Sequence, residues 1–133
     1  MILKQITVLA ENKCGGLEEI TDLLAKNQVD MRALTIADTK EFGIVRIIAD
    51  DEEKAVKTLT DSGFLCRITE VVGVKIPHRP GGLNEVLAVV KNAGVNVEYL
   101  YAFLSGQDGA KVALRVNDNE KAVKALKAAG FSN

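Results

Sequence analysis

The chain has 133 residues, of which 47% are hydrophobic and 26% are charged, a composition typical of a globular protein. The formal net charge is −1, so the chain carries no broad basic field that would hold nucleic acid or an anionic membrane. Cys14 and Cys66 lack CxxC spacing and His78 is the single histidine, which argues against a metal site, a disulfide framework or more than one triad-type catalytic centre.

No segment of the sequence has the character of a membrane span or a leader. No apolar run approaches the roughly 20 residues that a membrane helix needs, and the N-terminal stretch alternates too regularly for a signal peptide. We therefore expect a cytoplasmic protein that has neither membrane nor nucleic-acid partners and carries no cofactor.

The sequence contains an internal repeat. A shift of 66 residues places Gly15-Gly16-Leu17 on Gly81-Gly82-Leu83, and further along a shift of 67 places 54–57 on 121–124, both reading Lys-Ala-Val-Lys. Self-similarity at a fixed period indicates duplicated structural units. The sequence predicts one module over residues 1–70 and a second over residues 71–133.

The first module reads as strand, helix, two strands, helix and strand. Apolar residues alternate from Ile2 to Leu9, which is typical of a half-buried strand. After a glycine turn, Leu17, Ile20 and Leu24 share one face of a predicted helix. The remaining predicted elements are strands over Met31–Ala37 and Ile44–Ala49 around a turn at 38–43, an acid-capped helix within 50–63, and a strand over Phe64–Glu70.

The second module follows the same order but is shorter at its end. A strand over Val72–Ile76 precedes a helix whose apolar face is formed by Leu83, Val86, Leu87 and Val90. Strands over Val97–Leu104 and Lys111–Val116 then flank a turn at 105–109, and a second helix lies within 117–130. Only Phe131–Asn133 remains for the fourth strand. The second sheet is therefore either one strand short or completed by a neighbouring strand, since exposed edges invite pairing.

This element order predicts an α+β fold made of two ferredoxin-like βαββαβ repeats. Each repeat would form an antiparallel sheet with two helices on one face. A module of about 65 residues buries only about 60% of its unfolded surface and is marginal alone. We therefore expect the two copies to pack together and the chain to form a homodimer.

The loop between the first strand and first helix of each module carries the binding chemistry. It reads Asn-Lys-Cys-Gly-Gly-Leu over 12–17 and His-Arg-Pro-Gly-Gly-Leu over 78–83. Glycines at a helix start leave backbone N–H groups bare, and with the positive helix end these suit a carboxylate or phosphate. Pro80 fixes the turn that enters the helix.

These loops, in register with the duplicated pattern, resemble those of the ACT-domain family of amino-acid-sensing regulatory modules. The usual family loop is a polar residue, then Arg-Pro-Gly, one further residue, and Leu. The second loop matches except for His78 in the place of an acid or amide, whereas the first loop lacks the arginine and the proline. The resemblance covers essentially the whole chain.

The resemblance implies an amino acid or similar small carboxylate as ligand, held between two modules. Asn12 would then face Asn96, or His78 would face Asp30, with acceptors for the ligand ammonium group. Second-strand residues would line the side-chain pocket, namely Leu34 and Ile36, or Leu100 and Ala102. The full set of implied binding residues is Asn12, Cys14, Gly15, Gly16, Leu17, Asp30, His78, Arg79, Pro80, Gly81, Gly82, Leu83 and Asn96.

Each of these residues also has a simpler interpretation. The glycine pairs can serve only the turn, and Asp30 and Asn96 can simply begin a strand. His78 is interpreted as an exposed loop residue and Cys14 as an incidental small residue rather than a nucleophile, because no base accompanies it. The alternating aromatic residues Tyr99, Tyr101 and Phe103 share one strand face, which favours packing against a neighbouring sheet or subunit over ligand stacking.

These observations favour a free-standing regulatory protein that binds an amino acid and acts on a separate enzyme or transporter. The alternative is a non-catalytic interaction subunit with vestigial pockets. An enzyme is disfavoured, because the sequence shows no activated nucleophile and no phosphate-binding or dinucleotide glycine pattern.

Overall fold

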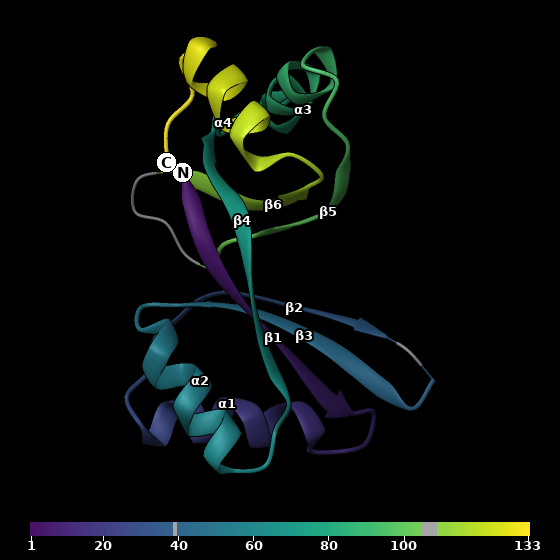
Figure 1. The fold of residues 1–133 in the computed structure, drawn as a ribbon, viewed down its shortest axis with the longest axis vertical. Helices are drawn as coiled ribbons and strands as arrows, with labels where there is room; N and C mark the ends of the chain where they lie inside the picture. Colours follow the sequence, from purple (N-terminus) through teal and green to yellow (C-terminus); the bar gives the residue numbers. More distant parts are fainter. Residues whose placement is uncertain (39, 105–108) are drawn as a thin grey trace. The chain divides into compact units, whose positions relative to one another are not determined.

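A computed structural model describes residues 1–38, 40–104 and 109–133, and its elements confirm the predicted order in both modules (Figure 1). The predicted turn at 105–109 therefore lies, except for Gly109, outside the described residues, as does Thr39 in the turn at 38–43. The elements are β1 (Ile2–Glu11), α1 (Gly16–Lys26), β2 (Met31–Asp38), β3 (Phe42–Ala49), α2 (Glu52–Asp61), β4 (Cys66–Ile76), α3 (Gly82–Asn92), β5 (Val97–Ala102), β6 (Ala110–Val116) and α4 (Asn119–Ala128).

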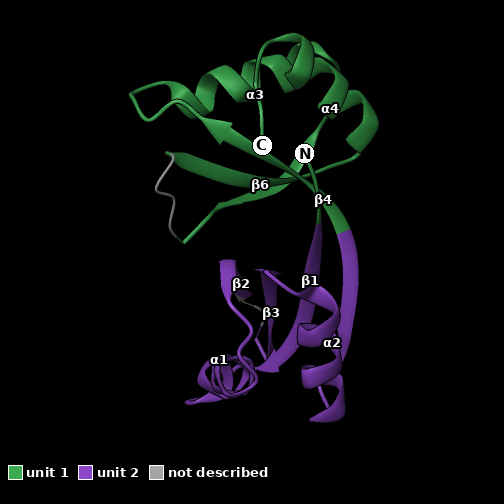
Figure 2. Cartoon of the chain, turned by 90° about the vertical axis from the view of Figure 1, so that its left-hand side faces the viewer, with its two compact units in different colours: residues 1–3, 70–133 green, residues 4–69 purple. Residues whose placement is uncertain are grey.

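The chain divides into two compact units, which Figure 2 shows in different colours. The repeat-one unit comprises Lys4–Thr69, and the repeat-two unit comprises Glu70–Asn133 together with Met1–Leu3. Each unit is described by itself below.

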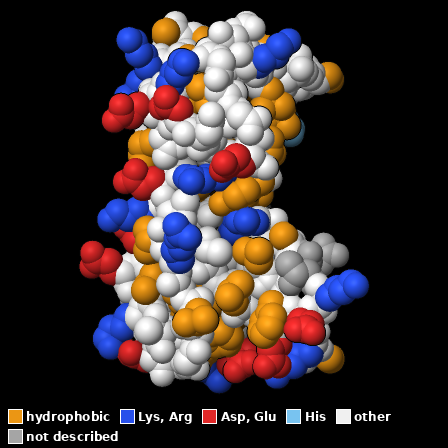
Figure 3. Space-filling model, turned by 45° about the vertical axis from the view of Figure 1, so that its right-hand side comes forward, with side chains coloured by type: hydrophobic (Ala, Val, Ile, Leu, Met, Phe, Trp, Pro, Cys, Tyr) orange, Lys and Arg blue, Asp and Glu red, His pale blue; other side chains and the backbone are white. Residues whose placement is uncertain are grey.

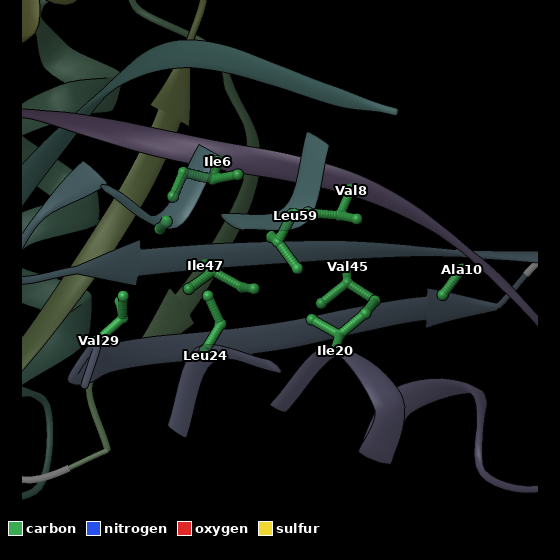
Figure 4. Close-up of a cluster of buried hydrophobic side chains, with 10 residues drawn as sticks. Ile6, Val8, Ala10, Ile20, Leu24, Val29, Val45, Ile47 and Leu59 are labelled. Atoms are coloured by element: carbon green, nitrogen blue, oxygen red, sulfur yellow. The ribbon is translucent and has the colours of Figure 1, made fainter. Parts of the chain in front are cut away.

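In the repeat-one unit, the antiparallel strand order is β2-β3-β1-β4, and α1 and α2 cover one face of this sheet. The pairing of β1 with β3 sets Val8 opposite Val45 on the helix-facing side. Ile20 and Leu24 of α1 point toward Val45 and Ile47 of β3 (Figure 4), as the predicted helical face requires. The buried core is formed by Ile6, Val8, Ala10, Ile20, Leu24, Val29, Val45, Ile47, Ala55 and Leu59.

In the repeat-two unit, the strand order from β4 onward is β4-β6-β5, again antiparallel, with α3 and α4 on one face. Val86 and Val90 of α3 are buried as predicted. The core is built like that of the first unit and consists of Val72, Val74, Val86, Val90, Val95, Val112, Leu114, Val116, Ala122 and Leu126. The predicted fold class, two ferredoxin-like repeats with helices on one face, is confirmed.

The turns that follow α1 and α3 have the same backbone conformation but are formed by different residues. The turn after α3 contains Gly94 at φ 73°, and the turn after α1 places Gln28 at φ 57° in the equivalent position. A glycine adopts this left-handed conformation without cost, whereas Gln28 carries some strain. Asp51 and Asp118 cap α2 and α4 by accepting hydrogen bonds from the N–H groups of Lys54 and Lys121, which confirms the predicted acidic caps.

Two predicted strands, Phe64–Glu70 and Val72–Ile76, are one strand in the structure. β4 runs without interruption from Cys66 to Ile76, because no turn-forming residue separates the two stretches. Gly43, which was expected in the turn before the third strand, lies inside β3. Its neighbour is the Ile36 side chain, which leaves little room for a Cβ atom.

The fourth strand of the second repeat is replaced by two short segments along β4, within the repeat-two unit. The Lys75 N–H donates to the Ser132 carbonyl oxygen at 2.8 Å, and the Gly73 N–H donates to the Met1 carbonyl oxygen at 2.7 Å. The first of these bonds is the counterpart of the Leu9 N–H to Leu65 carbonyl bond in repeat one. Neither Met1 nor Ser132 lies in a strand, so the second repeat has no regular fourth strand, and residues from the two ends of the sequence bond to β4 in its place.

Candidate functional site

The two glycine loops have the same hydrogen-bonding scheme. In the first, the Lys13 N–H donates to the Glu11 carbonyl at 2.9 Å, and the Gly16 N–H donates to the Lys13 carbonyl at 3.0 Å. In the second, Arg79 bonds to Pro77 and Gly82 bonds to Arg79 in the same way, both at 3.0 Å. The loops therefore have one conformation despite the absence of Pro and Arg in the first.

The two glycines of each loop serve different purposes. Gly15 and Gly81 have φ values of 81° and 84°, in the left-handed region, with open space where a side chain would begin. Gly16 and Gly82 are instead pressed against backbone, so that an added Cβ atom would collide with the carbonyl oxygens of Glu11 and Pro77. The first position requires glycine for its φ angle, and the second requires it for space.

The expectation that both glycines present bare amides is wrong for Gly16 and Gly82, because their N–H groups already bond inside the loop. The first bond of the α3 helical ladder runs from Glu85 to Gly81, and Gly81 provides no side-chain cap. The Leu83 and Asn84 amides precede that bond and lie at the positive end of the helix. By their position in the first turn of the helix, these two amides, rather than that of Gly82, are the donors that suit an anion.

The second loop borders a hollow of about 570 Å³ in the repeat-two unit. His78 is exposed there. Arg79 is held by Glu85 in the first turn of α3, with Nη2 at 2.7 and 2.9 Å from the two carboxylate oxygens. The hollow is lined by Ile76, Pro77, His78, Arg79, Pro80, Gly81, Gly82, Leu83, Asn84 and Ala110, so six predicted residues, 78–83, are brought together.

The first loop borders a hollow of about 430 Å³ in the repeat-one unit, but only Gly16 of the predicted residues lines it. Lys13 forms an ion pair with Glu11 at 3.0 Å, and this hydrogen bond raises the pKa of Lys13 above its ordinary value. Asn12 and Cys14 are exposed, and Leu17 packs against the core instead.

Asp30 and Asn96 occupy equivalent places, each just before a second strand. The Asp30 N–H donates to the Asp50 carboxylate at 3.0 Å, and the Asn96 N–H donates to the Asn117 side-chain oxygen at 2.9 Å. Asp50 and Asn117 were not singled out from the sequence, although they align at the shift of 67 residues. The Asp30 carboxylate also contacts Arg32, with Oδ2 at 3.1 Å from Nε.

Asn96 lies in a hollow of about 670 Å³ along α3, together with Asn84, Leu87 and Lys91. Of the predicted side-chain lining, Leu100 and Ala102 are exposed on β5. Ile36 on β2 is 48% exposed, whereas Leu34 packs against the repeat-one core. The helix end and the glycine loop of one module thus contribute to separate hollows.

The face of the molecule seen in Figure 3 shows no dominant charge. Figure 3 shows Lys and Arg side chains mixed with Asp and Glu side chains on the visible face, with hydrophobic side chains between them. No group of three or more His, Cys, Asp or Glu side chains in residues 1–38, 40–104 and 109–133 is placed to hold a metal ion. Within the same residues, no helix has the length and apolar character to cross a membrane.

The family is decided by comparison with known proteins. A family model for an ACT domain pair matches residues 1–131. This chain belongs to the ACT domain pair family. The match confirms the resemblance noted from the two glycine loops, and it covers both repeats.

Solved structures show the same fold as this ACT domain pair. Protein BT0572 from Bacteroides thetaiotaomicron is 39% identical, with a TM-score of 0.92, over 99% of this chain and 91% of the other. The regulatory subunit of aspartate kinase from Thermus thermophilus is 13% identical, with a TM-score of 0.68, over 96% and 92% of the two chains. The corresponding subunit from Thermus flavus is 14% identical, with a TM-score of 0.62, over 95% and 91%. No curated protein matches the chain.

Proposed function

We propose that this ACT domain pair is a non-enzymatic regulatory protein that senses an amino acid. The observation that carries the proposal is the second glycine loop, which combines a helix N-terminus, a hollow of about 570 Å³ and the polar residues His78 and Arg79. A helix N-terminus is a suitable site for a carboxylate. The ligand carboxylate would accept hydrogen bonds from the Leu83 and Asn84 amides.

The ligand ammonium group needs acceptors, which the unprotonated ring nitrogen of His78 and the Asn96 side-chain oxygen can supply. These two residues lie beyond opposite ends of α3, whose 11 residues span about 16 Å. A single amino acid does not reach across that length within one module. We therefore propose that the second glycine loop of one copy of the chain and the α3 end of a second copy hold the ligand, in place of the Asn12–Asn96 or His78–Asp30 pairs expected from the sequence. This is a second reason to expect a homodimer.

Repeat one is the weaker candidate for a ligand site. Among the predicted residues only Gly16 lines its hollow, whereas residues 78–83 all line the hollow of the second loop, and the Asp30 carboxylate is already paired with Arg32. The second candidate function is a non-catalytic interaction subunit with vestigial ligand pockets, and the absence of Asn12 and Cys14 from the lining of the repeat-one hollow favours it. We propose that the regulated target is an enzyme or transporter distinct from the ACT domain pair itself; regulatory subunits of aspartate kinase have a similar fold.

Calorimetric titration of the full chain with each of the twenty amino acids tests the proposal. We expect saturable binding of one amino acid or a small group of similar ones. His78→Ala and Asn96→Ala should each weaken binding about tenfold, the loss typical of one hydrogen bond to a charged group. Asn92→Ala, which changes an exposed amide at the end of the same helix, should bind as the unmodified chain does. If none of the twenty amino acids binds, the proposal is wrong.

A further inference from the structure

Two lysines lie directly opposite each other in the repeat-two unit. Lys75 on β4 pairs with Lys111 on β6 in the antiparallel register. Their neighbours Val74 and Val112 belong to the core beneath α3 and α4. Because successive side chains of a strand point to opposite faces, both lysines project from the sheet face that the helices leave uncovered.

Nothing in the described protein neutralises this pair of charges. Like charges directly opposite each other on neighbouring strands are destabilising. None of the ion pairs between described side chains involves Lys75 or Lys111. Both side chains are half-buried, and burial together with the charge of Lys75 lowers the pKa of Lys111.

The Lys111 ammonium group is held in a defined place. Its Nζ lies 4.8 Å from the centroid of the Phe103 ring, and the Phe103 N–H donates to the Lys111 carbonyl at 2.9 Å. A Cβ atom at Gly73 would collide with the Leu3 side chain but would make only an ordinary contact, at 3.4 Å, with the Lys111 Cε, so Leu3 and the lysine stem both lie against Gly73. A ring face attracts the ammonium group but does not cancel its charge.

Lys111 also borders a hollow of about 330 Å³, which adjoins the hollow of the second glycine loop and shares His78 and Ala110 with it. Its other described lining residues are mainly apolar, and they are Ala102, Phe103, Leu104, Gly109 and Ala110. Lys111 of the charge pair therefore lies beside an apolar surface that suits contact with the organic part of a ligand.

The repeat provides an internal comparison. The positions equivalent to Lys75 and Lys111 are Leu9 and Ile44, which face each other in the β1–β3 register of the repeat-one unit. An apolar pair at this point of the same fold is therefore sufficient for folding. The two lysines of repeat two are a local addition that the fold does not require.

We propose that Lys75 and Lys111 form an anion site for a phosphate group. A compact dianion can accept charge-assisted hydrogen bonds from both ammonium groups at once and remove their mutual repulsion. In a phosphate monoester, the organic part would lie against Phe103 and Ala102 in the adjoining hollow. This site goes beyond the proposed amino-acid sensing and does not depend on it.

The test is calorimetric titration of the full chain near neutral pH, at constant ionic strength, with inorganic phosphate and with phenyl phosphate. We expect both to bind, and phenyl phosphate to bind more tightly because its ring enters the hollow. Lys75→Met and Lys111→Met should each weaken phosphate binding at least about tenfold, the loss of one charge-assisted hydrogen bond.

Lys124→Met, which removes one exposed charge from α4 in the same unit, is the matched control and should leave phosphate affinity unchanged. Thermal unfolding in chloride separates binding from folding, because both site variants should be at least as stable as the unmodified chain once the repulsion is relieved. Phosphate stabilises many proteins without specific binding, so a stabilisation retained in both site variants would contradict the proposal, as would absence of calorimetric binding. Equal affinity for the two phosphates would assign the site to free phosphate alone.

Discussion

At the scale of single residues, the two glycines of each loop are adjacent in sequence but constrained in different ways. Gly81 needs a positive φ and has open space around it, whereas a Cβ atom at Gly82 would collide with the Pro77 carbonyl oxygen. The motif alone shows that glycine is present at both positions. Only the loop conformation shows which glycine is required for space.

Replacing these glycines separately should distinguish the two roles. Gly81→Ala should lower the free energy of unfolding by about 1–2 kcal/mol, the cost of a left-handed alanine. Gly82→Ala should cost about 1–3 kcal/mol from steric overlap, and it should also shift the loop away from the α3 N-terminus. Urea denaturation measures the stabilities, and amide chemical shifts of residues 77–84 report the loop. Equal shifts in the two variants would contradict the assignment.

At the scale of elements, α2 and α4 begin with the same kind of cap although the residues along the two helices are not all the same. Each has an aspartate whose side chain accepts a hydrogen bond from the N–H three residues later, at 3.0 Å in α2 and 3.1 Å in α4. The acid-rich start of each helix predicted this cap from the sequence, because capping is a local interaction. The two repeats thus retain the start of this helix, whereas the sequences of their glycine loops differ at the first three positions, 12–14 and 78–80.

Removing the caps should have similar effects in both repeats. Asp51→Ala and Asp118→Ala should each lower the free energy of unfolding by about 1 kcal/mol, the usual contribution of an N-cap. Asp61→Ala provides a comparison on α2, because it removes only an exposed ion pair with Lys57 and should cost at most about 0.5 kcal/mol. Chemical denaturation measures all three variants. A cost for Asp61→Ala as large as that of the cap variants would contradict this assignment.

At the scale of the whole molecule, the compact units do not coincide with the modules predicted from sequence. Met1–Leu3 belong to the first module by sequence but are grouped with the repeat-two unit, where Met1 accepts a hydrogen bond from Gly73. Ser132 accepts the bond from Lys75 two residues further along β4. The strand missing from the second repeat is thus supplied by residues from both ends of the sequence.

Deleting residues 1–3 should therefore weaken the second repeat rather than the first. We expect faster hydrogen exchange at the Gly73 amide, which loses its acceptor, while Val45 and Ile47 of β3 keep their protection. Deleting residues 132–133 should instead expose the Lys75 amide. Exchange measured by NMR resolves these positions. Loss of protection in β3 equal to that at Gly73 would show that the segment supports the first repeat.

The sequence by itself determined the duplication, the order of elements, the helix caps and the helix-facing core, because alternation, helical periodicity and capping are local patterns. It also determined which loops resemble those of ACT domains. The tertiary structure decided how the second sheet is completed and that β4 is one strand. It also decided that the Gly16 and Gly82 amides are already bonded, and that Lys75 faces Lys111. These features depend on strand register and on contacts between residues far apart in the chain, which no local pattern encodes.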